Sequence, residues 1–270
     1  MKRTLKTLMV FIVIIAVVLS GCGTKNTYFD YMKDGNVDKI IIKNARDKGL
    51  RFIITDAEKI NNLYKVLEVA ENTTSKTSLE TDYIIELYNA ADIVDTLNYV
   101  VGISSSEDGN LFNENNSFKV SKRLDEDIFS YLEDIRKPKY FNKVYYESIT
   151  KVVDTYNRSN SNSSVISFNI TDDDDVQKFI YSTELKNFTN QMSGKLNVVK
   201  DDASMGNLKL TFETIGYKSS TEDNALKATF KAKATIKAVD TGIITNYWIS
   251  NVYSGNSWNY NITTEEPSDF

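Results

Sequence analysis

The chain of 270 residues contains no histidine and a single cysteine, Cys22. Histidine is the usual general base for serine and cysteine nucleophiles and the commonest metal ligand in proteins. Its absence excludes Ser-His and Cys-His catalytic pairs and zinc sites built from cysteine and histidine. A carboxylate pair of the kind that glycosidases use is still available among 37 acidic residues, but no spacing marks one. We therefore expect a protein that is not an enzyme and that holds no metal and no other cofactor.

Four consecutive aspartates, Asp172 to Asp175, invite a calcium hypothesis, because hard cations prefer oxygen ligands. The run lacks the alternating ligand spacing, the turn glycine and the distal glutamate of a calcium-binding loop. We interpret Thr171 or Asp172 instead as the cap of a helix whose first turn carries acids that favour the helix dipole.

The N-terminus has the layout of an export signal. A basic start, with Lys2, Arg3 and Lys6, precedes an uninterrupted apolar run over residues 8–19. Twelve residues span roughly 18 Å as a helix, which is too short for a bilayer core of about 30 Å. The run ends in Leu-Ser-Gly-Cys at Cys22, which resembles the lipobox of bacterial lipoproteins.

This resemblance implies that Cys22 is diacylated and becomes the first residue of the mature protein, held on the outer face of the cytoplasmic membrane. An ordinary secretory signal with a chance cysteine, or an uncleaved N-terminal anchor, stays open as an alternative. Loss of the signal, which carries three Lys/Arg and no acid, would change the formal net charge from −5 to −8. An acidic chain of this kind has no overall electrostatic footprint for nucleic acid, so we expect no nucleic-acid partner.

Residues 37–137 form a predicted first module. Apolar runs at 38–44 and 50–55 indicate a hairpin, and Asp56 then caps a helix with apolar residues at helical spacing. Strands are expected at 83–87, 97–103 and 118–120, with a second helix over 124–135. The phrases FIITDAEKINNLYKVLEVAEN and DYIIELYN resemble the YhfM-like module of lipoproteins from Gram-positive bacteria. The resemblance implies an envelope protein and no particular chemistry.

Residues 142–264 form a predicted second module. A helix over 142–156, an apolar run at 165–170 and a second helix from about Asp173 precede a region with a period of two. Turn residues at 240–242 and 254–256 indicate a meander of four or five antiparallel strands, whose longest member should be twisted or bent. Two helices before such a meander, with the ending Trp258-Asn-Tyr-Asn-Ile, resemble the NTF2-like cone fold. A cystatin-like sheet over one helix explains much of the same pattern.

The long predicted strand suggests two binding surfaces. Its lysines share one face and could contact an anionic wall polymer or phospholipid head groups, although interleaved threonines and Glu213 are equally typical of a solvated face. Aromatic residues at the end of the chain could line a pocket in the open end of a cone, although such residues more often complete a core. Alanines at 228, 232, 234 and 238 either admit a closely packed helix or leave a cavity. The lysines are Lys227, Lys231, Lys233 and Lys237, and the aromatic residues are Tyr247, Trp248, Trp258 and Tyr260.

Together these features predict an α+β protein of two modules, each an antiparallel sheet with two helices. The leading functional hypothesis is a membrane-anchored lipoprotein that binds a protein or an envelope component. The alternative is a small-molecule receptor or carboxylate-based hydrolase that uses the concave face of the second module, and a transport receptor fits less well because parallel strand-helix alternation is missing. The expected segments are a signal at 1–21, a lipidated spacer at 22–36, the first module at 37–137, a linker at 138–141, the second module at 142–264 and a tail at 265–270.

Overall fold

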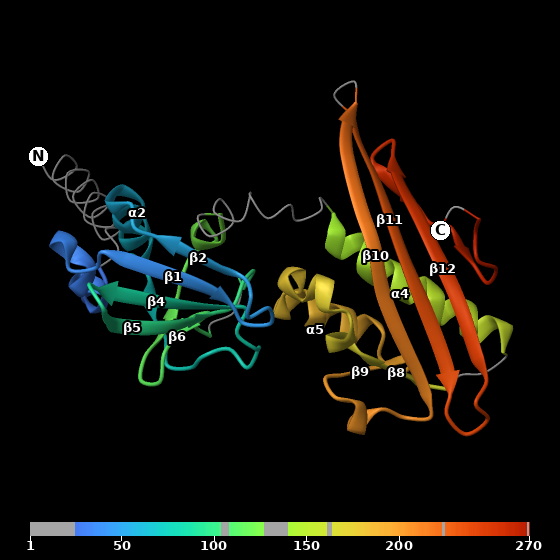
Figure 1. Ribbon diagram of the computed structural model, residues 1–270. Helices are drawn as coiled ribbons and strands as arrows, with labels where there is room; N and C mark the ends of the chain where they lie inside the picture. The colour runs from blue at the N-terminus through green and yellow to red at the C-terminus, as the bar shows by residue number, and fades with distance from the viewer. Residues whose placement is uncertain (1–24, 104–107, 127–139, 161–163, 223–224, 269) are drawn as a thin grey trace, which may run out of the picture.

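The computed structural model describes residues 25–103, 108–126, 140–160, 164–222, 225–268 and 270. It confirms the α+β class and the two modules, each with a sheet and its own core of buried side chains (Figure 1). Cys22 and the remainder of residues 1–24 lie outside the described part. In the described residues, no helix combines the length and the apolar character needed to cross a membrane.

The first sheet has seven strands in the described part of the chain, and every named pair is antiparallel. Side chains alternate between buried and half-buried along β1, as expected when one face of a sheet covers a core. The second strand of the central hairpin is β5, which begins at Asp92 and ends at Tyr99, so the predicted strand at 97–103 was placed too late. The pairing order is β2 (Arg51–Ile54), β1 (Lys39–Asn44), β4 (Tyr83–Asn89), β5 (Asp92–Tyr99), β6 (Leu111–Phe112), β7 (Ser117–Lys119) and β3 (Glu71–Asn72).

Two helical segments pack on the first sheet. Helix α2 (Ala57–Leu67) begins where predicted, because the Asp56 side chain accepts a hydrogen bond from the Lys59 backbone N–H at 2.9 Å. The 3-10 segment η1 (Thr27–Gly35) buries Phe29 and Met32 in the same core. The spacer predicted for 22–36 is therefore wrong for residues 27–35. The second helix predicted at 124–135 lies outside the described residues after residue 126, and residues 123–126 are helical.

The second sheet also has seven strands within the described ranges, and it is mixed rather than purely antiparallel. Strands β10 to β13 form the predicted meander, whereas β8 pairs with both β10 and β9 in parallel. A register shift between Thr214 and Gly216 bends the long β10–β11 pair, which agrees with the predicted distortion. The pairing order is β13 (Ser257–Asn259), β12 (Ile244–Ser254), β11 (Ala225–Ala238), β10 (Leu208–Glu222), β8 (Ile166–Asn169) and β9 (Leu196–Val199), with β14 (Ile262–Thr263) beside β12.

Helix α4 (Phe141–Ser159) packs on the inner face of β10–β12 (Figure 1). Ala232 and Ala234 are fully buried there, so the small side chains admit a closely packed helix. A buried polar contact adds to this packing: the Asn251 side-chain amide donates to Ser148 Oγ at 2.8 Å. The inner face, on which a receptor or hydrolase site was the alternative prediction, is thus filled by α4 over much of its length.

The helix predicted to begin near Asp173 is wrong. The chain forms two short 3-10 segments, η2 (Ile170–Asp172) and η3 (Asp174–Phe179), before α5 (Ser182–Gln191). Asp173 separates the segments because its carboxylate turns inward and accepts hydrogen bonds from the backbone N–H and hydroxyl of Thr214 on β10. A further 3-10 turn, η4, covers Asp202–Ser204.

Candidate functional site

The outer face of β10–β12 is rich in lysine. Because side chains alternate across a strand, the residues of β11 that face away from α4 include all four lysines that the sequence placed together. Two lysines of β10 join them, since the register pairs Lys209 with Lys237 and Lys218 with Thr229. We call this surface the basic face and define it by Lys209, Lys218, Lys227, Lys231, Lys233 and Lys237.

Opposite charge is scarce on the basic face. Among its described side chains Glu213 is the single acid, and it pairs across the strands with Lys233. The outward positions of β12 are uncharged, and the ring of Trp248 lies 5.6 Å from the Lys233 ammonium. An acidic chain therefore carries a strongly positive surface over one side of its second sheet.

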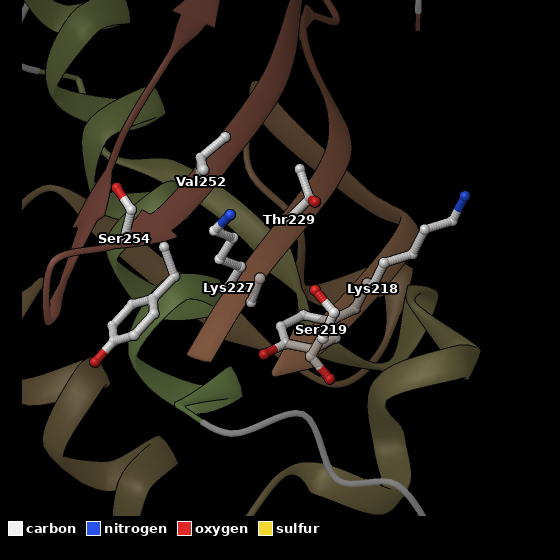
Figure 2. Close-up of a pocket in the computed structure, with 10 residues that line it drawn as sticks. Lys218, Ser219, Lys227, Thr229, Val252 and Ser254 are labelled. Atoms are coloured by element: carbon white, nitrogen blue, oxygen red, sulfur yellow. The ribbon is translucent and has the colours of Figure 1, made fainter. Parts of the chain in front are cut away.

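The basic face continues into a groove at one end of β10–β12, with a volume of about 1170 Å³. In Figure 2 the Lys227 ammonium points into the space between Val252 and Thr229, whereas the Lys218 ammonium points away. Hydroxyl and aromatic side chains provide most of the remaining surface. The described lining residues, none of which is acidic, are Tyr217, Lys218, Ser219, Ser220, Lys227, Ala228, Thr229, Val252, Tyr253 and Ser254.

The four aromatic residues singled out in the sequence do not form one pocket. Tyr247 is buried in the second core, and Trp248 lies on the opposite, outer face. Trp258 is buried with its ring 5.4 Å from that of Tyr253, next to the groove. The Tyr260 hydroxyl donates a hydrogen bond to the Glu147 carboxylate. The four side chains therefore share no pocket in the described residues, and the aromatic residues that line the groove are Tyr217 and Tyr253.

The C-terminal tail reaches the basic face. After β14, Glu265 and Glu266 pass a shallow depression beside Tyr247. The tail ends with the ring of Phe270 lying 5.5 Å from the Lys231 ammonium. The Phe270 ring thus covers part of the positive surface, whereas the two glutamates lie beside Tyr247.

The aspartate run does not form a metal site in the described residues, where no group of three or more His, Cys, Asp or Glu is suitably placed. The side chain that caps η2 is Asn169, which accepts from the Thr171 N–H, so the predicted cap at Thr171 or Asp172 is wrong. Asp173 is 4% exposed, and burial raises the pKa of its carboxyl to about 6, against the opposing effect of hydrogen bonds from Thr214.

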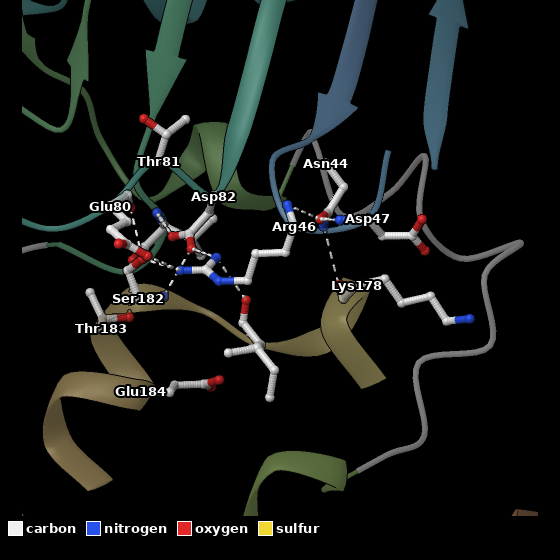
Figure 3. Close-up of polar contacts among 12 residues, drawn as sticks. Asn44, Arg46, Asp47, Glu80, Thr81, Asp82, Lys178, Ser182, Thr183 and Glu184 are labelled. Carbon is white, nitrogen blue, oxygen red and sulfur yellow. Dashed lines mark hydrogen bonds and ion pairs between the residues drawn. The ribbon is translucent and has the colours of Figure 1, made fainter. Parts of the chain in front are cut away.

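A buried ion pair joins the two modules (Figure 3). The Arg46 guanidinium lies 2.6 Å from the Asp82 carboxylate in the first module, and it also donates to Ser182 Oγ and to the Ile180 carbonyl in the second. Asp82 is 1% exposed and accepts the N–H of Ser182 at 2.9 Å and that of Val101 at 2.9 Å. We call these five residues the junction.

Further contacts extend the junction. Tyr181, from the segment before α5, is buried in the core of the first module. Ser182 Oγ donates to the Glu80 carbonyl, and Thr183 Oγ1 donates to the Val101 carbonyl. Both carboxylate oxygens of Asp82 accept hydrogen bonds within the protein, so the arrangement fits a structural clamp better than a catalytic acid. Sequence reasoning missed it, because no local motif surrounds Arg46 or Asp82.

Comparison with known proteins bears on the first module. Residues 33–138 match the YhfM protein family. The YhfM segment agrees with the resemblance that the sequence showed over residues 37–137, and it includes Arg46 and Asp82 of the junction. No curated protein and no solved structure matches the chain.

Proposed function

We propose that this protein is a non-catalytic lipoprotein, tethered outside the cytoplasmic membrane through Cys22, that binds an anionic polymer of the cell envelope on its basic face. The observation that carries the binding proposal is the excess of six lysines over one acid among the described side chains of that face. The tether is supported by the lipobox-like sequence at Cys22. The NTF2-like character of the second module likewise stays a prediction.

The geometry of β11 suits a linear ligand better than a compact one. Alternate residues of a strand are about 7 Å apart, so the span from Lys227 to Lys237 is roughly 33 Å. A polymer with regularly spaced phosphates or carboxylates can contact several lysines at once, whereas a small anion contacts one or two. Summed weak contacts of this kind give useful affinity that falls as salt screens them.

The groove supports binding more than hydrolysis. Hydrolysis of a glycosidic bond by carboxylates needs two acids flanking the bond, and the described lining residues include none. Its lysines, hydroxyls and tyrosine rings instead fit the end of an anionic chain that carries polar and ring-shaped units.

Neutralising two lysines of the basic face should weaken polymer binding. We expect Lys233→Gln with Lys237→Gln to raise the dissociation constant for long-chain polyphosphate by roughly tenfold or more, at about 1 kcal/mol for each lysine. The matched control, Lys65→Gln with Lys186→Gln, removes the same charge from exposed positions on α2 and α5. Binding should be measured on the full chain in detergent at low and moderate salt. An equal loss of polyphosphate affinity in the two double variants, or no binding by the unmodified protein, would contradict the proposal.

Removing the tail should have the opposite effect. Deletion of residues 265–270 removes Phe270 from Lys231 together with three acidic residues, two of them glutamates, so we expect several-fold tighter polyphosphate binding. The full-length variant Glu265→Gln with Glu266→Gln separates charge from coverage, because it keeps Phe270 in place. An unchanged affinity in both variants would show that the tail does not compete with the polymer.

A further inference from the structure

The turn between β11 and β12 exposes three aliphatic side chains within six residues. Val239, Ile243 and Ile244 have 49%, 63% and 55% of their surface exposed. The turn lies at the end of the sheet opposite the groove. Contiguous exposed apolar side chains at the tip of a hairpin mark an interaction site more often than isolated ones do.

Backbone hydrogen bonds hold these side chains outward. The Gly242 N–H donates to the Ala238 carbonyl at 2.8 Å, and the Ala238 N–H donates to the Ile243 carbonyl at 2.9 Å. Gly242 has a φ of 71°, a conformation that glycine adopts without strain. A third contact, from the Asp240 N–H to Asn207 Oδ1, ties the turn to the loop before β10. The aliphatic tip is therefore a formed surface of the fold.

Positive charge flanks the tip. Lys237 and Lys209 pair across β11 and β10 on the outer face, and Ile244 pairs with Lys237 on its other side. The acid in the turn, Asp240, uses its carboxylate to accept the Thr241 N–H at 2.7 Å. An anionic bilayer presents head-group phosphates at its surface and hydrocarbon beneath them. The tip has the matching order, because its branched aliphatic side chains lie beyond a pair of lysines that would meet the phosphates.

We propose that the turn of residues 239–244 inserts its aliphatic side chains into the surface of an anionic phospholipid bilayer. This inference rests on the proposed tether, which keeps the tip close enough to the bilayer for a weak contact to form. The two attachments together hold the second module in one orientation, so that the groove at the other end points away from the lipid.

The sequence offers a direct test, because Cys22 is the only cysteine. The proposed lipidation would consume its thiol. Thr241→Cys then supplies a single thiol for an environment-sensitive fluorophore at the exposed tip, and Ser257→Cys supplies the control at the exposed β12–β13 turn. The labelled full chain is reconstituted in vesicles of phosphatidylcholine, with or without phosphatidylglycerol. We expect a blue shift and quenching by quencher-bearing lipids at position 241, strongest with phosphatidylglycerol, and neither effect at 257.

Two further arms make the outcome decisive. Adding Ile243→Ser and Ile244→Ser to Thr241→Cys should abolish the blue shift, while the circular dichroism spectrum stays unchanged. A shift that is equal at both label positions, that persists in the serine variant, or that appears on adding another protein but not lipid would overturn the inference. Labelling of the unmodified chain would show that Cys22 is free, and so would refute the tether independently of the tip.

Discussion

Replacing Asp82 with alanine is expected to lower the free energy of unfolding by about 3–5 kcal/mol. The variant leaves the guanidinium of Arg46, whose side chain is 14% exposed, without the carboxylate that neutralises it. It also removes the acceptor for the backbone N–H groups of Val101 and Ser182. Each buried donor left without a partner adds about 1–3 kcal/mol of desolvation cost within that total.

Urea unfolding followed by circular dichroism and by tryptophan fluorescence should measure this effect. Both tryptophans, Trp248 and Trp258, belong to the second module, so fluorescence reports on that module and circular dichroism on both. With the junction intact we expect the two signals to change together, whereas in Asp82→Ala the transitions should separate.

Glu80→Gln is the matched control for Asp82→Ala. Glu80 contacts the same arginine at 3.7 Å, but its side chain is 57% exposed. A surface ion pair of this kind contributes at most about 1 kcal/mol, so Glu80→Gln should keep coincident transitions. The double variant Arg46→Ala with Asp82→Ala should recover part of the lost stability, because no unpaired charge remains buried. Equal effects of Asp82→Ala and Glu80→Gln would refute the clamp.

Replacing Asp173 with asparagine is expected to change how stability depends on pH. Burial raises the pKa of Asp173 from 3.8 to about 6 in the folded protein, so the folded state holds this proton more tightly than the unfolded state. The contribution of Asp173 is therefore most favourable below about pH 4 and becomes less favourable as the pH rises through 6. A shift of this size corresponds to about 3 kcal/mol at neutral pH.

Asparagine cannot ionise, yet its side-chain carbonyl can still accept the hydrogen bonds from Thr214. Relative to the unmodified protein, Asp173→Asn should gain about 2 kcal/mol between about pH 4.5 and about pH 7.5, as measured by urea unfolding at both values. Asp175→Asn, at an exposed position in the same run, provides the control and should show little difference. Parallel pH profiles for Asp173→Asn and the unmodified protein would contradict a raised pKa.

The junction affects how the basic face is placed but should not affect its affinity for a polymer. The clamp ties α5 to the sheet of the first module, while α5 belongs to the core beneath β10–β12. The junction therefore helps fix how the basic face lies relative to the first module. Loosening the clamp should leave local polymer affinity at the basic face largely intact, because none of its lysines contributes to the junction.

Much of the fold was predictable because it follows from short-range periodicity. The alternation of lysine with alanine and isoleucine in β11 determines which side chains share a face, since successive strand residues point in opposite directions. The cap at Asp56 and the β11–β12 turn follow from local backbone chemistry in the same way. The absence of histidine excludes whole classes of chemistry through composition alone.

The predictions from sequence failed where a side chain contacts residues that are distant in the sequence. Phe29 and Met32 have no periodic pattern, and they resemble part of a polar spacer, yet α2 and the first sheet bury them. Asp173 was predicted to be a solvated helix acid, but Thr214, 41 residues away, draws it inward and breaks the expected helix.

By itself, the sequence determined the two α+β modules, the lysine row and the excluded chemistries, because composition and strand period are local properties. Only the tertiary structure decided that α4 fills the inner face, that the lysines of β10 join those of β11, and that Arg46 clamps Asp82 to Ser182. These features depend on which distant segments meet, and Asp82 and Ser182 are 100 residues apart. Whether segments this far apart in the sequence come into contact depends on the packing of the whole core, so no local sequence pattern predicts it.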